Sequence, residues 1–134
     1  MSAVEYLLGE FDAHADGEWQ HWRRLERDLW ISDCRARHPE PRRELAVRGD
    51  IDVLSAPAPA LAHALREASE APVTSLVLHV DKVSFFDAAG VREFARAAQQ
   101  LESKGGRFRL RQASGLVAKV LEISGLGRLS LPEA

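Results

Sequence analysis

Hydrophobic positions in the second half of the chain follow two spacings, one typical of strands and one typical of helices. The run Ser75–Val80 joins Leu and Val residues without strict alternation, as in a central strand that is covered on both faces. In Arg107–Arg111, two apolar side chains alternate with three arginines, as in a strand with one buried face. Between these strands, apolar residues recur at i, i+3, i+4, i+7 and i+10. They predict an amphipathic helix whose buried stripe carries Val91, Phe94, Ala95, Ala98 and Leu101.

The first half of the chain predicts two further strands and a helix. The strands are Trp30–Ala36 and Leu45–Val47, joined by residues 38–41, whose prolines cannot continue a ladder. We expect this pair to be antiparallel. Ser55 is the expected N-cap of the helix, with Pro57 in its first turn and Pro72 beyond its end. Its buried stripe is formed by Leu61, Leu65 and Ala68.

Glycines and a serine mark the remaining boundaries. Gly105-Gly106 supplies a left-handed cap after the central helix, and Ser114 caps a last helix that ends at Gly125. A short strand is expected at 129–131. The order of strands and helices predicts an α/β fold: a mixed, largely parallel sheet of four to five strands with helices packed on it.

Residues 1–27 form a separate amphipathic extension in this interpretation, and residues 28–134 form the domain. Val4, Leu7, Leu8 and Phe11 recur at helical spacing, and Trp22, Leu25 and Leu29 repeat the pattern after Asp16-Gly17. We expect this helical, aromatic-rich extension to cover a face or edge of its own sheet. Homodimerisation or partner docking is the alternative. A membrane anchor is disfavoured because the segment is rich in Glu and Asp rather than Lys and Arg.

Composition narrows the class of protein. The 134 residues have a net charge of −2, which disfavours a direct nucleic-acid partner. A single cysteine, Cys34, cannot form an internal disulfide, and the acidic amino terminus lacks the basic region of a secretory signal. No apolar run approaches the ~20 residues of a membrane span. The sequence therefore predicts a cytoplasmic protein.

Candidate catalytic and metal-binding residues are weak. The five histidines show no ligand spacing with Cys or carboxylates, and no phosphate-binding glycine motif occurs, so no cofactor, metal or enzymatic activity is expected. His79 lies inside the central strand, where a buried, hydrogen-bonded imidazole is the favoured interpretation. Arg107, Arg109 and Arg111 form a basic row that favours a solvated strand face, with an anion or headgroup site as the alternative.

The turn Asp87-Ala88-Ala89-Gly90 joins the central strand, through a loop ending in Phe85-Phe86, to the central helix. The first residues of a helix expose unpaired N–H groups and a partial positive charge, and Asp87 at the N-cap satisfies some of those donors. A phosphorylated hydroxyl at position 88 would add strong negative charge there. Ala88 has no hydroxyl, so position 88 cannot be phosphorylated.

The segment Ser75–Phe94 with this turn resembles the signature of STAS domains, the fold of anti-sigma factor antagonists. Three other segments match in order and spacing, and the resemblance covers roughly 28–132: Val47-Arg48-Gly49-Asp50-Ile51-Asp52, Gly105-Gly106-Arg107-Phe108-Arg109-Leu110, and Val117–Gly125 with Leu126. In that family the residue after the turn's Asp is usually a Ser or Thr that a partner kinase phosphorylates.

The resemblance implies a non-enzymatic antagonist that binds an anti-sigma factor of kinase fold in bacterial partner switching. The family's docking patch falls on Asp52, Phe86, Asp87, Ala88, Ala89 and Gly90. With Ala88 in place of the phosphorylated residue, the protein is either always competent to bind or controlled elsewhere. Two alternatives stay open: Ala88 and Ala89 only pack the first helical turn, or the domain is a STAS-like subunit of a larger assembly such as a lipid-transport complex.

Overall fold

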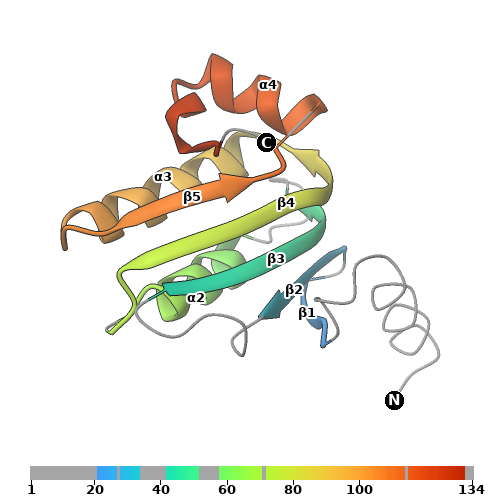
Figure 1. The fold of residues 1–134 in the computed structure, drawn as a ribbon. Coiled ribbons are helices and arrows are strands. Elements are labelled where there is room, and N and C mark those ends of the chain that lie inside the picture. The colour runs from blue at the N-terminus through green and yellow to red at the C-terminus, as the bar shows by residue number, and fades with distance from the viewer. Residues whose placement is uncertain are drawn as a thin grey trace.

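Five strands form one sheet in the computed structural model, with helices in the connections (Figure 1). The structure describes residues 21–26, 28–33, 42–51, 58–70, 72–113 and 115–131. The strands are β1 (Arg23–Glu26), β2 (Leu29–Asp33), β3 (Arg42–Ile51), β4 (Ser75–Phe86) and β5 (Arg107–Arg111), in that spatial order. The helices are α2 (Ala58–Ala68), α3 (Ala88–Glu102), α4 (Gly115–Ile123) and the short 3-10 helix η2 (Gly127–Leu129).

The sheet is antiparallel where it begins and parallel where it ends. β1 and β2 form an antiparallel pair, as do β2 and β3. β3, β4 and β5 are parallel, so α2 and α3 are crossover helices. Figure 1 shows both of them on the same face of the sheet. The predicted mixed α/β fold with helices packed on the sheet is confirmed.

One apolar core lies between this face of the sheet and the helices. Alternate residues of β3 enter it, including Leu45, Val47 and Ile51, and α4 adds Val117 and Leu121. Three phenylalanines run through the core from β4 to β5. The ring centroids of Phe86 and Phe94 lie 5.1 Å apart, and those of Phe94 and Phe108 lie 5.8 Å apart. Burying each such side chain contributes about 1.5–3 kcal/mol, so this row fixes α3 against the sheet.

The glycines that end α3 and α4 lie at the positions predicted from the sequence. Gly105 follows α3 with a φ of +79°, and Gly125 follows α4 with a φ of +78°, both in the region that favours glycine. The N–H of Gly106 donates to the carbonyl of Leu101, and that of Leu126 donates to the carbonyl of Leu121, which closes both helices. The strand predicted at Arg107–Arg111 has the same bounds in the structure.

Other predictions were wrong in their bounds or type. The helical spacing of Trp22, Leu25 and Leu29 belongs to the β1–β2 hairpin, because cross-strand pairing places Arg24 opposite Trp30. The boundary drawn between residues 27 and 28 lies between β1 and β2, and the division into an extension and a domain stays a prediction. β4 continues to Phe86 as a strand instead of giving way to a loop after Val80.

Three smaller differences concern the bounds of the other elements. β3 extends on both sides of the predicted Leu45–Val47. The segment expected as a strand at 129–131 contributes only an isolated bridge between Leu110 and Ser130, next to η2. β2 ends at Asp33, and Cys34, Ser55, Pro57 and Ser114 lie outside the described residues.

Candidate functional site

Asp87 joins the sheet to the central helix by its main chain. Its N–H donates to the carbonyl of Ile51 at 3.2 Å, so the contact between β3 and β4 continues one residue past the last strand position. Its own carbonyl accepts the N–H of Val91 at 3.1 Å, the first bond of α3. Asp87 therefore occupies the N-cap position that the sequence predicted. The helix begins at Ala88, and the bond to Ile51 fixes the position of its start relative to β3.

Gly90 brings the first turn of α3 into direct contact with the core. A Cβ at this position would lie 2.2 Å from Cε1 of Phe86 and 3.0 Å from Cγ2 of Ile51. Any side chain there would displace the Phe86 ring or the helix. Gly90 is thus required by packing, and Phe86, with an exposed fraction of 2%, is the support on which the turn rests.

Some of the predicted docking residues are exposed, and others are buried beneath the turn. Ala88 is exposed and Asp87 is half-buried, whereas Phe86 and Gly90 are buried and can affect a partner only through the shape of the turn. Ala89 lies in the same helical turn. Asp52 lies outside the described residues. The neighbouring Phe85, which the sequence interpretation did not include, has 45% of its surface exposed and adds a large apolar side chain beside the turn.

Irregular pairing of β4 explains why Phe85 faces outward. The register between β3 and β4 shifts twice, between Ala46 and Arg48 and between Gly49 and Asp50. At each shift β4 has one more residue than its partner, which is the pattern of a β-bulge. The second shift leaves Ser84 between the paired positions Val83 and Phe85. Bulges re-aim side chains, and here Ser84 and Phe85 are both exposed before Phe86 returns to the core.

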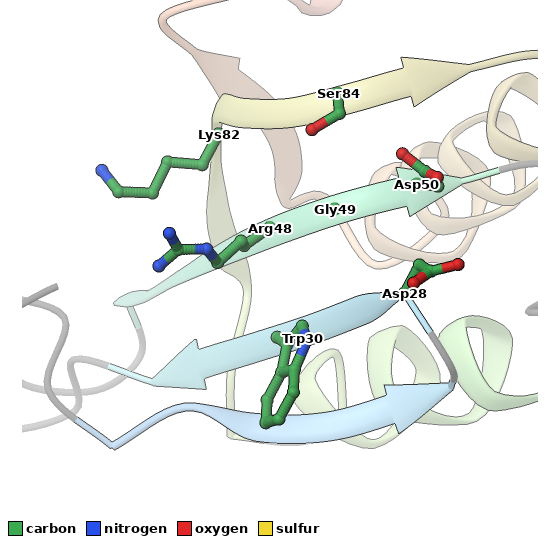
Figure 2. Close-up of a pocket in the computed structure, with 7 residues that line it drawn as sticks. All are labelled: Asp28, Trp30, Arg48, Gly49, Asp50, Lys82 and Ser84. Carbon is green, nitrogen blue, oxygen red and sulfur yellow. The ribbon is translucent and has the colours of Figure 1, made fainter. Parts of the chain in front are cut away.

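A shallow groove of about 550 Å³ lies on the sheet next to this bulge (Figure 2). Its walls come from β2, β3, β4 and the turn before β2. In Figure 2, Arg48 and Lys82 extend together toward one end of the groove, and Asp28 and Asp50 lie at the other. The groove thus presents cations and carboxylates at opposite ends. Its lining residues are Asp28, Trp30, Arg48, Gly49, Asp50, Lys82 and Ser84.

Gly49 allows the two sides of this groove to approach each other. Its φ is +110°, and a Cβ there would lie 1.8 Å from the carbonyl oxygen of Asp28. That oxygen accepts the N–H of Asp50 at 2.7 Å. A side chain at position 49 would break this contact, so the start of β2 is tied to β3 through a position that only glycine fits.

His79 is buried and hydrogen-bonded, as the sequence predicted. Its Nε2 lies 2.6 Å from Oε1 of Glu44, and both side chains are about nine-tenths buried. Within the described ranges, no group of three or more His, Cys, Asp or Glu side chains is arranged to hold a metal ion. No helix in that part of the chain is long and apolar enough to cross a membrane.

Comparison with protein families decides the class of domain. The family model described as "Mlab, STAS domain" matches residues 34–132, about three-quarters of the chain. The chain belongs to the STAS domain family. A search of curated proteins finds no match.

Solved STAS structures agree with this fold. An anti-sigma factor antagonist from Mycobacterium paratuberculosis is 21% identical, with a TM-score of 0.63 over 77% of this chain and 86% of that one. The antagonist SpoIIAA in its unphosphorylated form is 24% identical, with a TM-score of 0.54 over 69% and 80%. The Bacillus cell fate determinant SpoIIAA in its phosphorylated form is 22% identical, with a TM-score of 0.52 over 72% and 86%. These similarities establish that the domain has the fold of anti-sigma factor antagonists.

Sequence reasoning found the turn of this STAS domain but missed its surroundings. Phe85, Ser84 and the groove depend on the two bulges of β4, which arise from its pairing with β3. The signal that was available is the alternation of Lys82 and Ser84, which is consistent with a strand that continues past Val80.

Proposed function

We propose that this STAS domain is an anti-sigma factor antagonist, and that it binds an anti-sigma factor of kinase fold through the first turn of α3. The observation that carries the proposal is the exposure of Ala88 and Phe85 on either side of Asp87, at a helix start rigidly fixed by Gly90 and Phe86. An exposed small side chain at the start of the helix and an exposed large apolar one at the end of the preceding strand, joined by a rigid turn, are groups that a partner can pack against. The activity is competitive protein binding without chemistry.

The switch at this surface differs from that of a phosphorylated antagonist. Ala88 occupies the helix position at which a phosphate would face the exposed N–H groups and the dipole of α3. Its methyl group accepts no phosphate. We propose that binding is not controlled by phosphorylation at this position, and that the protein is constitutively competent or regulated at a different site.

The test of the proposal is a charge placed in the turn. Ala88→Glu puts a carboxylate close to Asp87 in the centre of the proposed interface, where an unpaired charge costs several kcal/mol. At about 1.4 kcal/mol per decade, affinity for the anti-sigma factor should fall at least a hundredfold. Acidic residues are favourable in a first helical turn, so the fold should be unaffected. The partner is first obtained by co-purification from the native host, and calorimetry then measures binding.

Gln99→Glu is the matched control. It adds the same charge at an exposed position of the same helix, near its other end, and should bind with the affinity of the unaltered protein. Unchanged affinity of a folded Ala88→Glu protein would remove the first turn of α3 from the interface and would overturn the proposal.

A second candidate function is supported by the description of the matching family model, which names Mlab rather than an antagonist. In this case the domain is a permanent subunit of a larger assembly, such as a lipid-transport complex, and the same turn is a constant contact. Co-purification distinguishes the two functions. An antagonist should be recovered with a kinase-fold protein at variable stoichiometry. A subunit should be recovered with a transporter ATPase at fixed stoichiometry.

A further inference from the structure

The face of the sheet opposite α2 and α3 carries most of the positive charge of the sheet. Side chains alternate along a strand, so the residues between the core positions Leu45, Val47 and Ile51 point to this opposite face. The strand register adds the aligned positions of the other strands. We call this surface the helix-free face. Its cations at described positions are Arg24, Arg42, Arg48, Lys82, Arg107, Arg109 and Arg111, and its carboxylates are Asp28, Glu44, Asp50 and Asp81. Some of these charges are already paired: Asp81 lies 3.5 Å from Lys82, and Glu44 lies 3.4 Å from Arg42. The cations still outnumber the carboxylates on this face.

The chain enters the described structure on this same face. Trp22 packs against Ala46 of β3, and the guanidinium carbon of Arg48 lies 5.6 Å from the centre of the Trp22 ring. Arg24 stacks in the same way on Trp30, also at 5.6 Å. Trp22 is therefore held against β3 by these contacts, beside the start of β1 and at one side of the basic surface.

Residues 1–20 have the opposite charge. They contain no Lys or Arg, and their acidic residues are Glu5, Glu10, Asp12, Asp16 and Glu18. The whole chain is nearly balanced, with 18 Lys and Arg against 20 Asp and Glu. The first twenty residues thus carry five carboxylates and no cationic side chain, whereas cations outnumber carboxylates on the helix-free face, so the net charges of the two are opposite.

We propose that residues 1–20 lie across the helix-free face of their own domain, with their carboxylates against Lys82 and the arginines of β5. The reach is sufficient. Twenty residues span about 30 Å even at helical rise. The four spacings between five strands amount to about 19 Å. A tether at Trp22 also gives an effective concentration in the millimolar range, which favours the segment over a free acidic partner.

This contact would be electrostatic and reversible. Exposed ion pairs are individually weak and are screened by salt, so the cover should be released as ionic strength rises. An acidic partner of the helix-free face would have to displace it. The inference does not depend on the proposed binding at Ala88, because it concerns the face of the sheet rather than the start of α3.

Carbodiimide cross-linking of the full-length protein tests the proposal, because it joins carboxylates to amines that are already in contact. The lysines are Lys82 on the helix-free face, Lys104 after α3 and Lys119 on α4, so the two others are internal controls. Trypsin releases residues 1–23 as one peptide, since the first cleavage site is Arg23. A mixture of isotopically labelled and unlabelled chains separates links within a chain from links between chains.

The expected result is a cross-link between Lys82 and the peptide 1–23 within one chain, lost in about 0.5 M salt as the Debye length falls well below 8 Å. Links only between chains would assign the face to a second copy of this chain and overturn the proposal. Equal links to Lys104 and Lys119, or none to Lys82, would also overturn it.

A second measurement covers the arginines, which carbodiimide does not report. Changing Arg107, Arg109 and Arg111 together to Gln should shift the amide NMR signals of residues 1–20. The matched triple change of Arg66, Arg92 and Arg96, which are exposed on α2 and α3, should leave those signals in place. Equal shifts in both variants would contradict the proposed location.

Discussion

Gly90 lies against the ring of Phe86 so closely that the first turn of α3 and the end of β4 share one packing surface. Because Gly90 has no side chain, the helix backbone packs directly against the Phe86 ring. The backbone hydrogen bonds of Asp87 fix the chain between Phe86 and Gly90. The ring in turn lies 5.1 Å from Phe94 one helical turn further on. The position of the proposed binding turn is therefore determined by the aromatic core beneath it.

Gly90→Ala should destabilise the domain and shift the start of α3. The added methyl group would lie 2.2 Å from the Phe86 ring, and over-packing of this kind costs about 1–3 kcal/mol. Urea unfolding followed by fluorescence measures the loss, and partner binding should weaken as well. Gly127→Ala is the control, because a methyl group there would have its nearest neighbouring atom 3.9 Å away, and the stability should change little. Equal stability of the two variants would contradict this account of Gly90.

Ala88→Ser should create a site for phosphorylation by the kinase-fold partner. The residue is exposed at the helix start, and the serine hydroxyl would supply the phosphate acceptor that Ala88 does not provide. Phosphopeptide mapping after incubation with the partner and nucleoside triphosphate should find phosphate on residue 88 in this variant and not in the unaltered chain. Ala88→Val adds bulk without a hydroxyl and should remain unlabelled. Phosphate found on Ser84 of the unaltered protein would instead place the switch on the bulge.

Glu44→Ala should cost about 1–3 kcal/mol of stability, because it removes the buried partner of His79, which lies 2.6 Å away. Glu44→Gln keeps an oxygen that can accept from the imidazole and should lose less. Glu70→Ala, at an exposed position after α2, should have little effect. Denaturant unfolding at neutral pH ranks the three variants, and a Glu44→Ala protein as stable as Glu70→Ala would show that the pair contributes nothing.

Glu102 should titrate at a lower pH than an ordinary glutamate. The Arg128 guanidinium donates a hydrogen bond of 2.7 Å to Oε2 of Glu102, and this bond, more than the charges of Arg128 and Arg109, lowers the pKa of the carboxyl. A lowered pKa in the folded state means that the pair stabilises the fold above the ordinary pKa of Glu and that this is lost as the pH falls through the lowered value.

The effect is small because the pair is exposed, so the pKa itself is the quantity to measure. Carboxyl-carbon NMR titration should show the pKa of Glu102 returning toward its ordinary value in Arg128→Gln. Titration of Glu102 at the same pH in both proteins would contradict the assignment.

Local patterns were enough to predict some of these elements, and long-range pairing determined the others. β5 and the stripe of α3 follow directly from residue spacing, and Gly105 and Gly125 follow from the backbone that a helix end requires. Trp22, Leu25 and Leu29 have helical spacing, but pairing of Arg24 with Trp30 makes their segment a hairpin. The family resemblance located the turn at Asp87. Exposure of Phe85 could not be read from the sequence, because the bulge that causes it depends on the register of β3.

The two borders of the sheet leave little room for another strand. β1 has four residues and an irregular register with β2, and the carbonyl of Leu110, near the end of β5, already accepts the N–H of Leu131. A protein that recruits this domain by extending the described sheet would therefore find a short, distorted border on one side and a partly occupied one on the other. For this part of the chain we expect recognition to depend on side chains, at a helix start or on a sheet face. Single substitutions can change such surface chemistry without disturbing the hydrogen bonds between strands.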